Sequence, residues 1–179
     1  MTTPPTFTTG DVLTAAQMNA VGLWLVKSQT VGSGVSSVTV TGAFSADYDN
    51  YRIIYSGGTA SATADISLKL GASVTGYYGS LQFQTVTAGT VSAAGLNNGT
   101  SFSWIGGATA GQAVHASVEL FNPFAAMYTK LRHATYQNGD AYGTMNGEHR
   151  IATSYTDFIL TPSSGTITGG TIRVYGFRN

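Results

Sequence analysis

The residue types that carry acid–base and metal chemistry are scarce in this chain. Its 179 residues include three histidines and no cysteine, which excludes a disulfide, a thiolate metal site and a cysteine nucleophile. Zinc and iron sites need imidazole and carboxylate ligands at close spacing. His115, His133 and His149 lie on three separate predicted strands, without HxH or HExxH spacing. We therefore expect no metal centre, and we expect these histidines on sheet surfaces or at interfaces.

A hydrolase would need a nucleophile with its base, or an acid with a base. Glu148, His149 and Arg150 adjoin in the sequence, but on a strand His149 faces the opposite side from its two neighbours. The chain also lacks GxSxG, a P-loop and a complete dinucleotide-binding glycine motif. These features predict a protein that is not an enzyme and needs no cofactor. Glycoside cleavage by two of the eight scattered acidic residues stays open as an alternative.

One short acidic segment resembles the start of a calcium loop. Asp47 and Asp49 have the right spacing, but Tyr51 and Arg52 stand where further oxygen ligands and a turn glycine are needed. The segment is therefore interpreted as a polar turn before a strand.

Two groups of side chains are candidates for contact with a receptor or another subunit. Aromatic rings can stack on sugar faces while their polar atoms form hydrogen bonds, and the candidates near predicted strand ends are Tyr77, Tyr78, Trp104 and Tyr136. For these rings, burial in the core is the alternative. The charged candidates, which share one predicted sheet face, are Lys130, Arg132, Glu148 and Arg150. A solvated sheet face is the alternative for them.

The overall charge limits the classes of partner. Eight basic and eight acidic residues give no net charge, so nucleic acid and anionic membranes are not expected partners. Charged residues make up 9% of the chain, against about 25% in ordinary soluble domains. Because weak charge repulsion favours self-association, we expect a homo-oligomer, with a trimer as the leading case. A secretory signal and an apolar membrane span are not apparent, so we expect synthesis in the cytoplasm and no membrane insertion.

The elements that must position these residues are predominantly strands. From residue 23 onward, runs rich in Val, Ile, Thr, Tyr and Phe are separated by turn residues, which predicts an all-β, antiparallel, jelly-roll-like β-sandwich over 23–179. The predicted strands are 23–31, 36–41, 50–56, 64–70, 80–87, 101–105, 113–121, 127–137, 142–152, 155–161 and 171–177. The turns between strands include Gly57-Gly58, Gly106-Gly107, Asn138-Gly139 and Gly169-Gly170.

Two segments are expected to lie outside the sheet. Residues 1–22 form an extended Pro/Thr tail and one short helix over 11–20, whose Thr14 and Gln17 fit a capping box. A helix this short must dock on something, and the candidate attachment or oligomerisation residues are Phe7, Leu13, Met18 and Val21. The polar, small-residue segment 87–99 is predicted to be a mobile loop or one that a partner orders.

The register of one hairpin can be predicted from the sequence. Segments 127–137 and 142–152 flank Asn138-Gly139-Asp140, whose residues tolerate the left-handed conformations of tight turns. A two-residue loop at Asn138-Gly139 would place Lys130 opposite Gly147. A three-residue loop would place Lys130 opposite Glu148 and Met127 opposite Ile151. The second register is favoured because an ion pair and an apolar pair then form across the strands.

Three segments resemble bacteriophage proteins. Residues 7–19, FTTGDVLTAAQMN, are similar to the "G-x-x-Leu-Thr-Ala-x-x-x-Asn" stretch that opens many structural proteins of tailed phages, particularly tail-fibre and minor tail proteins. Residues 44–53, FSADYDNYRI, and 165–177, GTITGGTIRVYGF, also resemble segments of phage virion proteins. Together they cover about a fifth of the chain.

The resemblance implies a structural component of the virion. Such proteins are homo-oligomers, commonly trimers, with an N-terminal segment that attaches to other virion proteins and a β domain that binds a host glycan or protein receptor. Since the chain lacks a collagen-like repeat, a heptad shaft and an extended β-helix, a short fibre tip or knob, or a head decoration protein, fits better than a shaft. A tail component or fibre that binds a receptor is the leading expectation. A capsid decoration protein or head spike is the alternative, and a glycan depolymerase is the third hypothesis.

Overall fold

The fold is built from strands alone in the part of the chain that the computed structural model describes, residues 9–10, 12 and 22–177. The all-β, antiparallel prediction is confirmed, and the predicted helix over 11–20 lies, apart from the non-helical Val12, outside the described residues. In chain order the strands are β1 (Leu23–Thr30), β2 (Val38–Val40), β3 (Asn50–Ala60), β4 (Ala64–Leu70), β5 (Tyr77–Thr85), β6 (Val91–Gly99), β7 (Phe102–Ala108), β8 (Ala113–Phe121), β9 (Thr129–Asn138), β10 (Ala141–His149), β11 (Phe158–Pro162), β12 (Ile167–Thr168) and β13 (Thr171–Phe177).

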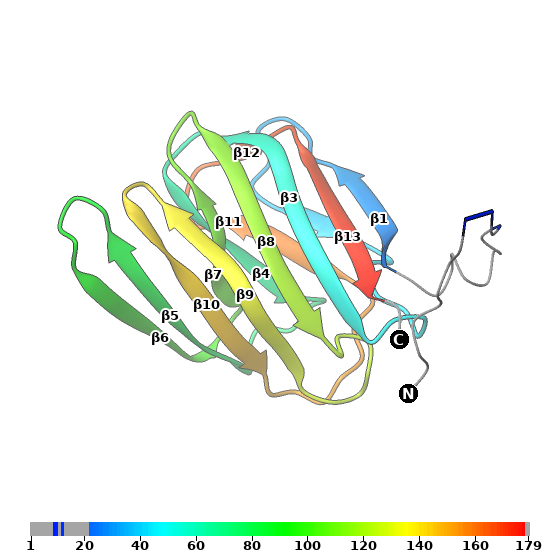
Figure 1. The fold of residues 1–179 in the computed structure, drawn as a ribbon. Coiled ribbons are helices and arrows are strands. Elements are labelled where there is room, and N and C mark those ends of the chain that lie inside the picture. The colour runs from blue at the N-terminus through cyan, green and yellow to red at the C-terminus, as the bar shows by residue number, and fades with distance from the viewer. Residues whose placement is uncertain (1–8, 11, 13–21, 178–179) are drawn as a thin grey trace.

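These strands form one hydrogen-bonded sheet that folds back on itself at β8. One edge of β8 pairs with β3, whereas the other edge is shared, with Ala116 opposite β7 and Glu119 opposite β9. A front layer therefore runs β1-β13-β3-β8-β9-β10-β5-β6, and the branch β7-β4-β11-β2 lies behind it (Figure 1). The front layer carries the candidate contact residues except Trp104, which lies on β7.

Glycine allows the close approach at the fold-back. A Cβ atom on Gly106 would lie 2.2 Å from the carbonyl oxygen of His115, and one on Gly107 would lie 2.0 Å from that of Gln137. Both glycines lie inside β7, so the prediction of a turn at this pair is wrong. Their role is steric, because β7 passes against two neighbouring strands. The prediction of a turn at Gly57-Gly58 is also wrong, because this pair lies inside β3, where the register with β8 shifts.

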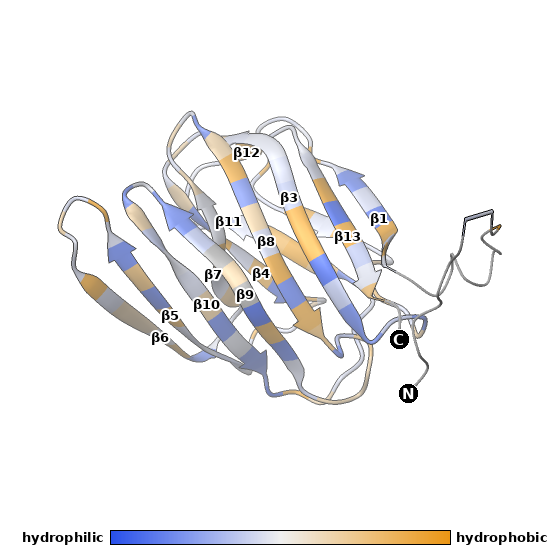
Figure 2. Ribbon diagram, viewed as in Figure 1, coloured by the Kyte–Doolittle hydropathy of each residue, from blue (hydrophilic) through white to orange (hydrophobic). Residues whose placement is uncertain are grey.

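The core lies between the two layers and follows from the alternation of side chains along each strand. Alternate residues of β4 and β8 are buried, as the sequence predicted. Apolar and polar residues alternate visibly along the front strands (Figure 2). The largest fully buried side chains include Tyr51, Tyr55, Phe102 and Phe158, and they belong to one continuous apolar cluster.

The predicted hairpin is confirmed, but its loop differs. β9 and β10 are joined by a two-residue loop, Gly139-Asp140, with Gly139 at a φ of 57°. Between Met145 and Gly147 the register shifts by one, because β9 has an extra residue there. The bulge brings Lys130 opposite Glu148, which is the predicted pairing. Met127 precedes β9 and is half exposed, so it is not part of the β9–β10 ladder.

Segment 87–99 is not a loop, because most of it forms β6, which pairs with β5 along its length. The segment is rich in Ala, Gly and Asn, which give little β signal. Backbone pairing to the edge of β5 nevertheless orders it, with Ala94 and Leu96 packed against the core. The loop that was expected to await a partner is therefore ordered within this chain. Strand β12 was also missed, and its two residues pair with β3.

Candidate functional site

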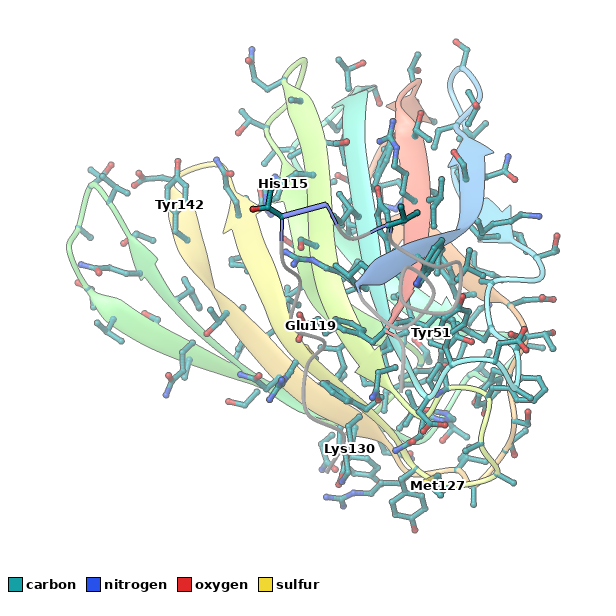
Figure 3. All side chains as sticks on the ribbon, turned by 45° about the vertical axis from the view of Figure 1, so that its right-hand side comes forward. Tyr51, His115, Glu119, Met127, Lys130 and Tyr142 are labelled. Atoms are coloured by element: carbon teal, nitrogen blue, oxygen red, sulfur yellow. The ribbon has the colours of Figure 1, made fainter. Side chains whose placement is uncertain are left out.

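The outer face of the front layer carries a row of cross-strand neighbours that spans six strands. The row follows from the registers of five successive pairings. From β13 to β5 its members are Phe177, Asn50, Phe121, Lys130, Glu148 and Tyr78. Glu119 and Lys130 lie along this face, with Lys130 toward one end of the strands and His115 and Tyr142 toward the other (Figure 3). Aromatic and charged groups thus meet on a continuous surface.

The centre of the row is a three-residue ion cluster. Lys130 and Arg150 both donate hydrogen bonds to Glu148, one to each carboxylate oxygen. These two contacts hold the pKa of the Glu148 carboxyl below its usual range and raise the pKa of the Arg150 guanidinium. The Lys130 and Arg150 side chains remain 55% and 50% exposed, so both cations face solvent.

An aromatic ring supports the cluster from β5. The guanidinium carbon of Arg150 lies 4.1 Å from the centre of the Tyr78 ring, which is a cation–π contact. Tyr78 is in turn the cross-strand neighbour of Glu148. The sequence therefore places a tyrosine, a carboxylate and two cations together through the registers of β5, β10 and β9.

A shallow cavity of about 420 Å³ lies beside this cluster and opens outward. Its floor is the directly paired backbone of Gly79 and Gly147. The pair Tyr78–Glu148 lies on one side of that floor, and the pair Ser80–Asn146 lies on the other. Lys130, Leu131 and Arg150 complete the lining. The cavity thus combines cations, a carboxylate, an aromatic ring and hydrogen-bonding groups.

A second cluster adjoins the first on β8 and β9. Arg132 lies 3.5 Å from the Glu119 carboxylate and 4.8 Å from the centre of the Phe121 ring. With Asn50 and Phe177, these three residues line an open cavity of about 350 Å³. Arg132 shares the outer face of Lys130, as predicted, but it pairs with Glu119 and not with Glu148. The sequence could not single out Glu119 or Phe121, because their neighbours come from strands distant in the chain.

Basic charge is concentrated on this outer face even though the chain as a whole is neutral. Five of the eight basic residues lie here, namely Arg52, Lys130, Arg132, Arg150 and Arg173. Among the acidic residues that the structure describes, Glu119 and Glu148 alone accompany them. The formal charge of the face is therefore +3, which the neutral total conceals.

The prediction that Tyr77 is a contact residue is wrong, because this side chain is fully buried. Its hydroxyl accepts a hydrogen bond from the Leu70 amide at 2.8 Å and donates one to the Ser73 carbonyl at 3.3 Å. Burial raises the pKa of this phenol. Since neighbouring residues of a strand face opposite sides, Tyr77 points into the core when Tyr78 points outward.

Two other aromatic candidates also lie apart from the ion cluster. Trp104 is half-buried against the core, in an irregular part of β7 where its φ is 62°. Tyr136 is buried, and desolvation followed by the nearby Asp65 carboxylate raises its pKa to about 12. For both rings the core alternative is the one that the structure favours.

The expectation that the histidines lie on sheet surfaces or at interfaces is wrong for His149. His149 is fully buried, with its ring between Tyr77 and Tyr155. Nε2 lies 3.0 Å from the Ser73 hydroxyl and 3.1 Å from the Thr75 carbonyl oxygen, whereas Nδ1 has no hydrogen-bond partner. Burial lowers the pKa of this imidazole. His115 lies on the outer side of β8, and the side chain of His133 is outside the description.

In the described part of the chain, His, Asp and Glu do not gather in groups of three that could hold a metal ion. Asp47 accepts a hydrogen bond from Ser45 within a turn, in keeping with the polar-turn interpretation. The same residues include no helix long and apolar enough to span a membrane. The attachment candidates Phe7, Leu13, Met18 and Val21 lie outside the described residues.

Comparison with known proteins adds no relative: no family model matches the chain, and no curated protein is significantly similar to it.

Proposed function

We propose that the chain is a non-enzymatic structural protein of a tailed-bacteriophage particle, a tail or fibre component whose β domain binds a host receptor. The observation that carries the receptor role is the continuous outer row, in which exposed cations and an aromatic ring border an open cavity. The resemblance of residues 7–19, 44–53 and 165–177 to phage virion segments supplies the particle context. The folded-back sheet supports a jelly-roll-like β-sandwich as the receptor-binding domain.

Self-association is part of the proposal, with a homotrimer as its leading form. Strand β1 pairs only with β13 among the described strands, so its second edge is unpaired. Leu23 and Leu25 on this strand are 44% and 56% exposed. A free edge with apolar side chains favours pairing with another chain. The low charge of the protein favours contact between copies in the same way.

The N-terminal segment completes the assignment. Residues 1–22 attach the β domain to other virion proteins after assembly in the host cytoplasm, and the virion is the final location. Nucleic acid and membrane lipid are not partners in this proposal, and no cofactor takes part.

Two measurements test the assignment. Mass spectrometry of purified particles of a phage that encodes the chain should detect it, and electron microscopy with an antibody to the β domain should label the tail. Labelling of the capsid would replace the tail assignment with the decoration or head-spike alternative. Absence of the chain from intact particles would refute the virion assignment altogether.

A cell-binding assay tests the receptor role separately. The fluorescently labelled full chain should bind a subset of bacterial strains in a panel. The double variant Lys130→Glu/Arg150→Glu should lose that binding, whereas Lys69→Glu on the back strand β4 should keep it. Equal binding by both variants would exclude the outer face as the receptor site. Release of sugar from isolated cell-surface polysaccharide would instead support the depolymerase hypothesis.

A further inference from the structure

We propose that the cavity between β5, β9 and β10 binds a carboxylate-bearing sugar, whose carboxylate contacts Lys130 and Arg150. This inference rests on the proposed receptor-binding function and names the chemical class of the receptor. The cavity of about 420 Å³ has the size of small-molecule sites and opens to the surface, as a terminal or internal sugar of a glycan chain requires.

The ion cluster is suited to a single negative charge. Lys130 and Arg150 carry two positive charges, and Glu148 between them neutralises one. The remaining charge matches one carboxylate better than a doubly charged phosphate. The ammonium of Lys130 has three donors and the guanidinium of Arg150 has five. Their contacts with Glu148 use one N–H group of each, which leaves donors for a second carboxylate.

The remaining lining is suited to a sugar ring. Ser80 and Asn146 form the side of the cavity opposite the Tyr78–Glu148 pair and carry groups that hydrogen-bond to hydroxyls.

The arrangement of acids argues against nucleic acid as the ligand. Glu148 lies between the cations of the first cluster, and Glu119 pairs with Arg132 in the second. A phosphate backbone needs a continuous series of cationic contacts, and these two carboxylates interrupt the series. A single acidic sugar needs only the local pair of cations at the cavity.

Titration calorimetry on the full-length protein tests the inference. The probes are trigalacturonate and galactotriose, which differ in the carboxylate at C6. We expect trigalacturonate to bind at least tenfold more tightly. Equal affinities would overturn the inference, as would tighter binding of galactose 6-phosphate than of galacturonate. A hexathymidylate that binds as tightly as trigalacturonate would overturn it in favour of a general polyanion surface.

Variants assign the binding to the cavity. Lys130→Gln and Arg150→Gln should each weaken trigalacturonate binding at least fivefold, whereas the matched variant Lys69→Gln should leave it unchanged. Glu148→Gln removes the competing carboxylate and should strengthen binding. Weakening by Lys69→Gln to the same extent would place the site elsewhere. Thermal unfolding of each variant shows whether the protein remains folded.

The two proposals can fail separately. If the chain is found on particles but does not bind trigalacturonate, only the ligand class is overturned. If the chain is absent from particles, the proposed function is overturned whatever the calorimetry shows.

Discussion

Lys130 and Glu148 lie directly opposite each other on β9 and β10 and form an ion pair on the outer face of the front layer. The pairing depends on two local features, the two-residue loop Gly139-Asp140 and the bulge in β9. Without the bulge, the register at the loop would place Lys130 opposite His149, a core residue. The bulge therefore sets which side chains line the cavity, a role that bulges often have beside functional sites.

We expect a weak coupling between Lys130 and Glu148. A double-mutant cycle with Lys130→Gln and Glu148→Gln should give a coupling free energy of about 0.2–1 kcal/mol, because both side chains are partly exposed and water screens the pair. Urea unfolding of the four proteins measures this value. The coupling should diminish in 1 M salt. A coupling that is zero within error at low salt would contradict the ion pair.

Gly107 tests the close approach at the fold-back of β7, and Gly95 on β6 is the matched control position. A Cβ atom on Gly107 would clash with the Gln137 carbonyl oxygen, whereas one on Gly95 would meet no atom within 4 Å. Gly107→Ala should therefore lower the free energy of unfolding by about 2 kcal/mol or more, as overpacking against backbone does. Gly95→Ala should change it by less than about 1 kcal/mol. Urea unfolding compares the two, and equal effects would contradict the close approach of β7.

The adjacent tyrosines should respond differently to loss of the hydroxyl. Tyr77→Phe leaves the buried Leu70 amide without its side-chain acceptor, which should cost about 1–3 kcal/mol of stability. Tyr78→Phe keeps the ring beneath Arg150 and should cost less than about 0.5 kcal/mol. Thermal and urea unfolding measure both variants. A larger loss for Tyr78→Phe would mean that the assignment of inner and outer faces of β5 is reversed.

These tyrosines show where prediction from the sequence succeeds and fails. Residues 64–70, 113–121 and 171–177 were predicted with the bounds that the structure has, because apolar and β-branched residues alternate clearly there. Segment 77–79 has no such alternation, so the sequence could not assign Tyr77 inward and Tyr78 outward. β6 was missed because its small side chains carry little signal and its order comes from backbone pairing to β5.

The candidate site was predictable only where its contacts are local. Lys130 and Glu148 belong to one hairpin, so opposite charge indicated their pairing, although the loop has two residues and the bulge in β9 was not predicted. Glu119 comes to Arg132 through the pairing of β8 with β9, which depends on the path of the whole sheet. The concentration of basic charge on one face has the same origin. The composition alone shows a neutral chain. Only the order of the strands in the sheet shows that basic residues gather on one face.

The stability of the protein should fall in mildly acidic solution because His149 is buried as a neutral imidazole. Above its ordinary pKa of about 6.5, the imidazole is neutral in both states. Below that value the unfolded chain binds a proton that the folded protein binds only at lower pH, so the free energy of unfolding falls. The groups that face the ring are the phenols of Tyr77 and Tyr155, the Ser73 hydroxyl and the Thr75 carbonyl.

Urea unfolding between pH 7 and pH 5 measures this dependence. His149 should contribute a slope of up to about 1.4 kcal/mol per pH unit. His149→Gln should remove that contribution and lower the stability at pH 7, whereas His115→Gln on the outer side of β8 should keep the slope of the unmodified protein. An unchanged slope in His149→Gln would show that another group causes the acid sensitivity.

The final prediction separates the β domain from its N-terminal segment. Every buried apolar residue of the described core lies at Val31 or beyond, so deletion of residues 1–22 should leave a folded β domain. The truncated protein should unfold cooperatively, with the same near-UV dichroism as the full chain. It should no longer attach to phage particles. Light scattering should still show self-association, which Leu25→Lys at the free edge of β1 should abolish. A truncated protein that is unfolded would mean that the N-terminal segment belongs to the core.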